Sequence, residues 1–403
     1  MTGPGLDWPA RYHAALAHTF GAPRRVLARA EGTHVWDVDG RCYTDFLSGI
    51  AVTVLGHAHP AVGAAVSAQL GQLDHVSNFF ATPPQITLAE RLGALASPEG
   101  RPAHVFFGNS GAEANEAAFK LTRLTGRTRI VAMEDGFHGR TMGALAVTHH
   151  PSYREPFAPL PGEVVFAPYG DVDALRAAVD ATTAAVVVEP VQGESGVKVA
   201  PPGFLSAARA ITAEAGALLW VDEVQSGLGR CGEWLVSVAD GVAPDIVTLA
   251  KGLGNGFPIG ACIALGAAGE LFTPGSHGTT FGGNPVAAAA GLAVLDTLRD
   301  EQLVEAARNL GDHLAAAIAA RANPLIALVR GRGLLRGIVL ARPIAAAVND
   351  ALLEAGWIAN APRPDVIRVA PPLIVTRAEL DAFAVALDQA VTAVADGKEG
   401  EAA

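Results

Sequence analysis

The segment GFLSAARAITAEAGALLWV (203–221) contains the alternation that decides the fold. Apolar residues recur at helical spacing over 203–215, and residues 217–221 form a short, wholly apolar run that is typical of a buried strand. Working outward, the same features predict strands at 104–107, 129–133, 184–188 and 246–250, and helices at 61–73, 84–96, 112–124 and 172–180. Short apolar strands separated by helices indicate an α/β protein whose mainly parallel sheet is covered by helices on both faces.

The two ends of the chain show different patterns. Residues 34–47 alternate apolar and polar around Asp39-Gly40, which predicts a hairpin with a two-residue turn. Residues 285–309 predict one helix that leads away from the sheet. Beyond it, a smaller α+β unit is predicted, with strands at 326–330, 334–340 and 366–369, helices at 345–354 and 376–394, and a polar tail at 396–403.

The length of 403 residues exceeds what one hydrophobic core usually holds. We therefore expect a large domain at 56–295 and a smaller domain assembled from the two chain ends, 1–55 and 296–403.

Composition excludes several classes of function. The net charge of −11 argues against nucleic acid or an anionic membrane as partner. The three cysteines stand far apart and no Cys/His spacing suits zinc, so we expect reduced thiols and no metal. The N-terminus has no apolar signal region, and the uncharged stretch 252–269 contains Pro258 and many glycines, which suit a membrane span poorly. These features favour a soluble cytoplasmic protein.

Two glycine-containing turns follow predicted strands. In FFGNSGAEANE (106–116) a strand leads through Ser110 directly into a helix, where free backbone amides and a hydroxyl attract a phosphate. The alternative is that Ser110 or Asn109 simply caps the helix. In DGFHGRT (135–141), Phe137 offers a flat ring and Arg140 a bidentate cation, although a core Phe and a surface Arg would look the same.

Two charged residues also stand at predicted strand ends. Asp222 follows the strand 217–221, where its carboxylate can pair with a pyridinium N–H, or it can cap the next helix. Lys251 ends the strand 246–250, where a desolvated neutral amine is a nucleophile that forms an imine, or the side chain can reach solvent. A phosphate turn, a ring-stacking residue, an acid and a lysine, each after a strand, together indicate a bound aromatic aldehyde phosphate.

These residues stand in segments that resemble the class III (ornithine-type) aminotransferases of the fold-type I pyridoxal-phosphate superfamily. The matching strings are NSGAEANEAAFK (109–120), FHGRT (137–141), EPVQGESG (189–196), VDEVQSGLGR (221–230), TLAKGLGNGFPIGA (248–261) and HGTTFGGNP (277–285). Within the class, four more segments favour N-acetylornithine as amino donor: 48–62, 75–80, 329–340 and 366–373. The likeness spans about Arg29 to Leu387.

The resemblance implies pyridoxal 5'-phosphate as cofactor and assigns roles to individual residues. Lys251 would hold the cofactor as a Schiff base and shuttle the proton, and Asp222 would pair with the pyridine nitrogen. The other cofactor contacts would come from Ser110, Gly111 and Ala112 at the phosphate, Phe137 on the ring, Glu189 in the supporting network and Gln225 at the phenolic oxygen. Thr280 would reach the phosphate from a partner subunit, which makes a homodimer part of the expectation.

The resemblance also implies how the substrates bind. Arg140 would bind the α-carboxylate of the donor, with help from Thr279 and Asn78. Arg368 would bind a carboxylate of 2-oxoglutarate, and Glu194 would neutralise Arg368 while the donor is bound. The alternative for this pair is a permanent structural ion pair.

Other activities of the same fold remain open at this stage. The donor could be succinyl-diaminopimelate, ornithine, 4-aminobutyrate or an acylated lysine precursor. An isomerase of the glutamate-semialdehyde aminomutase type would share Lys251 and need no external acceptor. A non-catalytic binding protein is disfavoured because Lys251 and Asp222 are both present.

Overall fold

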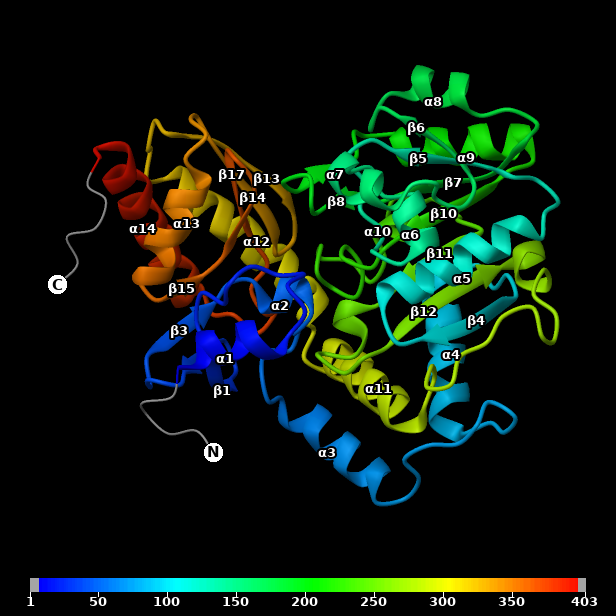
Figure 1. Cartoon of the computed structure of the whole chain (residues 1–403), viewed down its shortest axis with the longest axis horizontal. Helices are drawn as coiled ribbons and strands as arrows, with labels where there is room; N and C mark the ends of the chain where they lie inside the picture. The colour runs from blue at the N-terminus through cyan, green and yellow to red at the C-terminus, as the bar shows by residue number, and fades with distance from the viewer. Residues whose placement is uncertain (1–6, 398–403) are drawn as a thin grey trace.

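The computed structural model describes residues 7–397 and is built around one seven-stranded sheet (Figure 1). The strand order is β4 (Ala103–Gly108), β12 (Gly260–Leu265), β11 (Ile246–Leu249), β10 (Leu218–Asp222), β7 (Thr183–Val188), β5 (Arg129–Met133) and β6 (Glu163–Ala167). In this sheet, β12 runs antiparallel to both of its neighbours and the other neighbouring pairs are parallel. The predicted mainly parallel sheet is therefore confirmed.

Helices cover both faces of this sheet, and the strands bury apolar side chains toward each. Val187 and Trp220 pack with α5 (Gly111–Arg123), whereas their chain neighbours Val186 and Leu219 pack with α9 (Phe204–Ala215). This is the alternation of side-chain direction expected along a strand. The remaining helices on the sheet and its edges are α4 (Pro83–Ala96), α8 (Val172–Ala178), α11 (Pro285–Asp300) and, packed on α11, α3 (Pro60–Leu70).

The two chain ends meet in a second part of the molecule, drawn in blue and in orange to red in Figure 1. One sheet has the order β1 (Leu27–Glu31), β2 (His34–Asp37), β3 (Cys42–Asp45) and β15 (Trp357–Ile358), so it joins both ends of the chain. The other has the order β13 (Ile326–Arg332), β14 (Leu335–Leu340), β17 (Val366–Val369) and β16 (Asn360–Arg363), and is covered by α12 (Leu303–Ala319), α13 (Ala345–Glu354) and α14 (Arg377–Ala395). We propose that the large domain spans residues 56–295 and that the smaller domain is formed by residues 1–55 and 296–403.

Short elements complete the described chain. They are α1 (Trp8–Ala15), α2 (Ser48–Ala51), α6 (Met142–Ala146), α7 (Pro151–Arg154), η1 (Glu155–Phe157), β8 (Val191–Gln192), β9 (Lys198–Val199), α10 (Val236–Ala239), η2 (Lys251–Leu253) and η3 (Gly266–Glu270). No helix within residues 7–397 is both long and apolar enough to cross a bilayer. Residues 398–403 of the predicted polar tail lie outside the described residues.

Two local predictions were wrong. The helix predicted over 285–309 is broken into α11 and α12, because Gln302 has a φ of 55° and a left-handed residue cannot continue a right-handed helix. The hairpin turn at Asp39-Gly40 is longer than two residues. The amide of Asp37 donates to the carbonyl of Arg41 (3.0 Å), which leaves three loop residues, with Gly40 at φ 86°. A left-handed Gly at the third position suits such a turn.

Two strands of the large sheet were missed. β12 lies inside the stretch 252–269, whose lack of charge and many glycines obscured a fully buried six-residue strand. β6 is an edge strand with one fully buried residue, so its apolar pattern is weak.

Candidate active site

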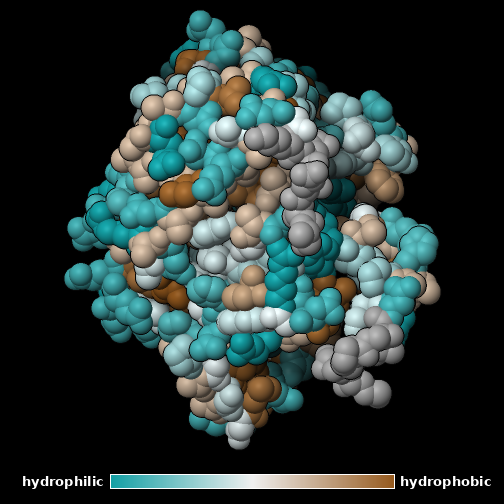
Figure 2. Space-filling model, turned by 90° about the vertical axis from the view of Figure 1, so that its left-hand side faces the viewer, coloured by the Kyte–Doolittle hydropathy of each residue, from teal (hydrophilic) through white to brown (hydrophobic). Residues whose placement is uncertain are grey.

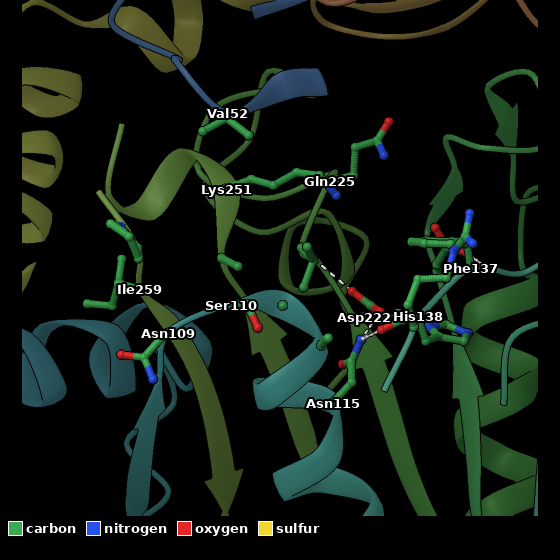
Figure 3. Close-up of a pocket in the computed structure, with 18 of the residues that line it drawn as sticks. Val52, Asn109, Ser110, Asn115, Phe137, His138, Asp222, Gln225, Lys251 and Ile259 are labelled. Carbon is green, nitrogen blue, oxygen red and sulfur yellow. Dashed lines mark hydrogen bonds and ion pairs between the residues drawn. The ribbon is translucent and has the colours of Figure 1, made fainter. Parts of the chain in front are cut away.

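A cavity of about 430 Å³ lies at the carboxyl ends of the parallel strands (Figure 3). Five of the predicted cofactor residues lie at the end of a different strand or a few residues beyond it: Ser110 after β4, Phe137 after β5, Glu189 after β7, Asp222 at the end of β10 and Lys251 after β11. This edge of an open α/β sheet is where ligands bind, because several strand ends converge there. Residues that line the cavity include Ser110, Gly111, Ala112, Phe137, Arg140, Glu189, Asp222, Gln225 and Lys251.

Lys251 occupies a strained backbone position and carries a desolvated amine. Its φ of 44° is unusual for a residue with a side chain, and such strain clusters at functional sites. Burial lowers the pKa of Lys251, although the charges of Glu194 and Asp222 oppose this effect. Since lowering the pKa increases the neutral fraction, the amine is prepared to act as a nucleophile. Lys251 is partly buried and its side chain lines the cavity, so it does not extend freely into solvent, the alternative considered from the sequence.

Asp222 is held by three hydrogen bonds and keeps an acceptor position free. Its Oδ2 accepts from Nδ2 of Asn115 (2.8 Å) and bonds Nδ1 of His138 (2.7 Å), while its Oδ1 accepts from the backbone amide of Val224 (2.9 Å). A carboxylate offers about four lone-pair positions. Oδ1 can therefore accept a further N–H from a group in the cavity.

His138 holds the carboxylate of Asp222 in place by a hydrogen bond. Burial lowers the pKa of His138, but its hydrogen bond to Asp222 and the nearby charges of Asp222 and Glu189 outweigh burial, so the pKa is raised. The Nδ1–H of His138 therefore donates to Oδ2 of Asp222. The sequence analysis assigned no role to His138 or Asn115. Their positions in the sequence could have indicated a role, because both lie within motifs that carry the family resemblance. Asn115 stands five residues after Ser110, and His138 directly follows Phe137.

The turn before α5, where an anion site is predicted, caps its helix. Oγ of Ser110 accepts from the amide of Glu113 (3.1 Å), so the capping alternative is confirmed without excluding the other role. Gly139 approaches this turn closely: a Cβ there would stand 2.8 Å from Cβ of Ala112, at a φ of 141°. The backbones of the two turns are thus packed against each other beside the cavity.

Glu189 supports the ring side of the cavity. One of its carboxylate oxygens, Oε1, accepts from the amide of Phe137 (2.9 Å). Burial is the main reason that the pKa of Glu189 is raised to about 8, and the His138 charge opposes it. Gln225 also lines the cavity and contacts Glu194 and Arg368. Its Oε1 accepts from Nη1 of Arg368 (3.2 Å), and its Nε2 donates to Oε1 of Glu194 (3.5 Å).

Glu194 and Arg368 form an ion pair beside Gln225. Burial would raise the pKa of Glu194, but the Arg368 guanidinium outweighs it and lowers the pKa below its usual range. The Arg368 side chain is 1% exposed, its Nε donates to Oδ1 of Asn360 (3.0 Å), and its Nη2 is buried without a partner. No described residue accepts a hydrogen bond from Nη2, so this nitrogen can still donate to a further acceptor.

Five predicted residues do not line the cavity of their own chain. Glu194 and Arg368 lie beside Gln225, which does line it. The other three, Asn78, Thr279 and Thr280, lie elsewhere. Asn78 donates through Nδ2 to the carbonyl oxygens of Thr279 (3.2 Å) and Gly282 (3.3 Å). These residues therefore form one cluster at the surface, where Asn78 and Thr280 are exposed.

The cavity fits a phosphorylated pyridine aldehyde. It combines an amide-lined helix start, a free acceptor position on a buried carboxylate and an amine whose pKa is lowered by burial, each at a different strand end. These are the groups that a phosphate, a ring nitrogen and an aldehyde need.

A family model described as "Aminotransferase class-III" matches residues 16–391. The chain belongs to the class III aminotransferases. The expected family, its enzymatic transaminase chemistry and its cofactor, pyridoxal 5'-phosphate, are thereby confirmed, as is the fold-type I α/β architecture.

Individual members of the family are similar over nearly the whole chain. An acetylornithine aminotransferase of Streptomyces coelicolor is 56% identical over 397 residues, which cover 97% of this chain and 98% of that protein. One from Mycobacterium tuberculosis is 58% identical over 94% of both chains. Among solved structures, an N-acetylornithine aminotransferase from Stenotrophomonas maltophilia has a TM-score of 0.82 and 34% identity, covering 96% of this chain and 99% of that chain. An ornithine aminotransferase from Toxoplasma gondii has a TM-score of 0.90 at 32% identity and covers 96% of this chain and 95% of that chain.

Proposed function

We propose that the protein transfers the δ-amino group of N2-acetyl-L-ornithine to 2-oxoglutarate, giving N-acetylglutamate 5-semialdehyde and glutamate, as a step of arginine biosynthesis. The observation that carries the chemistry is that Lys251, whose pKa is lowered by burial, shares one cavity with the buried carboxylate of Asp222. The choice of donor is supported by relatives named acetylornithine aminotransferase, which are 56–58% identical over almost the full chain.

The bound cofactor supplies an aldehyde that takes up an amino group and a conjugated ring that withdraws electrons. Lys251 would hold the cofactor through Nζ, would give way to the donor's amine, and would move the proton at the carbon that bears that amine. Asp222 would bind the ring nitrogen through its free acceptor position, because Asn115 and His138 hold its carboxylate in place. Phe137 supports one ring face, and the amides of Gly111 and Ala112 with Ser110 bind the phosphate.

The substrates are placed by cations at opposite sides of the cavity. Arg140 binds the α-carboxylate of the donor, so that the distal amine lies at the cofactor. Glu194 masks Arg368 while this donor is bound and releases it when 2-oxoglutarate arrives. The unpartnered Nη2 of Arg368 supports this second role. One cavity can then accept two differently charged substrates in turn, as a ping-pong exchange requires.

We propose further that the enzyme works as a homodimer in which Thr280 binds the phosphate held by the partner subunit. Thr280 lies in a surface cluster with Asn78 and Thr279, which would complete the partner's site. Large apolar side chains are exposed beside this cluster: Phe79 (92%), Phe80 (69%) and Phe281 (62%). Such a group indicates a protein interface. The side of the molecule seen in Figure 2, in contrast, shows mostly hydrophilic side chains with scattered apolar ones.

We place this activity in the cytoplasm. Cys42, Cys231 and Cys262 are free thiols, which is usual in a reducing compartment.

Borohydride trapping tests the chemistry. Reduction of the cofactor-bound enzyme should bleach its visible band and add the cofactor mass to the peptide that contains Lys251, because the reduced bond no longer exchanges. Lys251→Ala should give no such adduct. Lys198→Ala, which alters a lysine that does not line the cavity, should label as the wild type does. An enzyme that carries no reducible cofactor would contradict the proposal.

A panel of donors with 2-oxoglutarate tests the substrate. We expect N-acetylornithine to give the highest kcat/KM. Faster turnover of 4-aminobutyrate, ornithine or succinyl-diaminopimelate would move the assignment to that donor, and turnover without any oxo acid would favour an isomerase.

A further inference from the structure

Arg140 is oriented by aromatic rings instead of by an acid. Its Cζ lies 3.6 Å from the ring centre of Tyr153 and 5.8 Å from that of Phe137. Within residues 7–397, no carboxylate lies within ion-pair distance of its guanidinium. Arg368, the other cation at the cavity, is instead held by Glu194 and Asn360.

Tyr153 is itself backed by a second ring. The His150 ring is stacked on that of Tyr153, with centroids 3.9 Å apart and planes 13° apart. Nδ1 of His150 lies 3.0 Å from Oγ of Ser152, which restrains the histidine ring. Both rings belong to the start of α7, a short helix that the sequence analysis did not assign to any function.

This arrangement has a chemical consequence for binding. A guanidinium held by an acid must break that contact before it can bind a carboxylate. A guanidinium held over a ring face keeps its planar set of N–H donors and its full charge available. The stack therefore restrains the side chain while leaving its hydrogen-bonding edge free.

We propose that Tyr153, backed by His150, is a positioning residue that orients Arg140 for the α-carboxylate of the amino donor. The inference rests on the proposed function, because it uses the donor's carboxylate. It adds a residue that determines preference for donors that carry a carboxylate remote from the reacting amine.

The test follows each half-reaction of the cofactor-bound enzyme separately by its visible absorbance. Tyr153→Leu should weaken N-acetylornithine binding by about 3- to 20-fold, the range expected for loss of one cation–π contact. Tyr153→Phe should behave as the wild type, because the contact is made by the ring face.

A donor without the carboxylate separates positioning from general damage. N-acetylputrescine has the same reactive amine as N-acetylornithine but lacks the α-carboxylate, so Tyr153→Leu should leave its weak turnover unchanged. Trp36→Leu is the matched control, since it removes an arginine–aromatic contact (Arg29, 3.8 Å) outside the cavity. If Tyr153→Leu loses its cofactor, His150→Ala provides the second test, with an expected donor-specific weakening of about twofold or more.

Several outcomes would overturn the inference. One is that Tyr153→Leu weakens N-acetylornithine and N-acetylputrescine turnover equally. A second is that Tyr153→Phe binds N-acetylornithine as weakly as Tyr153→Leu does. A third is that neither Tyr153→Leu nor His150→Ala changes the binding of N-acetylornithine. Failure of the proposed function gives a different result, because the wild type itself would then not use N-acetylornithine.

Discussion

Replacing Glu194 with Gln tests whether its ion pair with Arg368 opens during turnover. The substitution keeps the shape of the side chain and removes its charge. Arg368 is 1% exposed and retains Asn360 and Gln225 as acceptors, so it stays in place, but its charge becomes available to a ligand. If Glu194 is a mask, 2-oxoglutarate no longer has to displace it.

The size of the effect follows from the surroundings of the pair. A hydrogen bond between charged groups contributes about 1.5–3 kcal/mol. The Glu194 side chain is 34% exposed, so solvent screens part of this interaction. We therefore expect that about 1–2 kcal/mol of competition is removed, which tightens 2-oxoglutarate binding by about 5- to 30-fold. The donor half-reaction should weaken by a similar factor, because an unmasked cation then lies near the donor's amine.

Single-turnover measurements of each half-reaction provide the assay. The aldehyde form of the enzyme is mixed with N-acetylornithine, and the amino form with 2-oxoglutarate, over a range of concentrations. Asp240→Asn is the control, since it breaks a bidentate ion pair with Arg332 (2.9 and 3.0 Å) without touching the cavity. It should leave both half-reactions unchanged.

The result that refutes this reasoning is a Glu194→Gln enzyme whose binding of 2-oxoglutarate is unchanged or weaker. The pair with Arg368 would then be a permanent structural link, the alternative that the sequence left open.

Three further predictions concern the cofactor side of the site. Asp222→Asn should retain the cofactor but lower the rate of proton transfer by about 100-fold or more, because the buried charge is lost; near-normal single-turnover rates would contradict this. Burial raises the pKa of Glu189 to about 8 from an ordinary 4.5, so the folded state binds a proton that the unfolded state releases, and stability declines as pH rises through this window. Glu189→Gln should therefore flatten the fall in melting temperature of cofactor-free protein between about pH 6 and 9, and an equally steep fall in the variant would show that Glu189 is not responsible. Gly139→Ala should weaken cofactor binding by about 10-fold or more in a fluorescence titration, since its Cβ would stand 2.8 Å from that of Ala112 at a φ of 141°. Gly126→Ala has a positive φ but open space around it, so it should leave cofactor affinity unchanged, and a similar loss there would exclude the clash as cause.

Local pattern accounts well for the large sheet and its residues. The apolar runs at 184–188 and 217–221 predict β7 and β10 because a strand buried on both faces needs apolar side chains at every position. Asp222 and Lys251 were expected at the ends of such strands, and the structure has them there. The pattern failed at β12, where small residues gave no signal that distinguishes a strand from a loop.

The sequence by itself determined most strands and helices of the large sheet, and which polar residues follow those strands. It also determined the family, because six motifs occur in order. Only the tertiary structure decided which of these residues meet. Asn115, His138 and Asp222 come from three separate elements, and Glu194 and Arg368 are 174 residues apart. The Tyr153 ring over Arg140 likewise has no pattern in the chain. Secondary structure follows from interactions between neighbours in sequence, whereas these contacts depend on the order of strands in the sheet and on how the chain ends pack beside it.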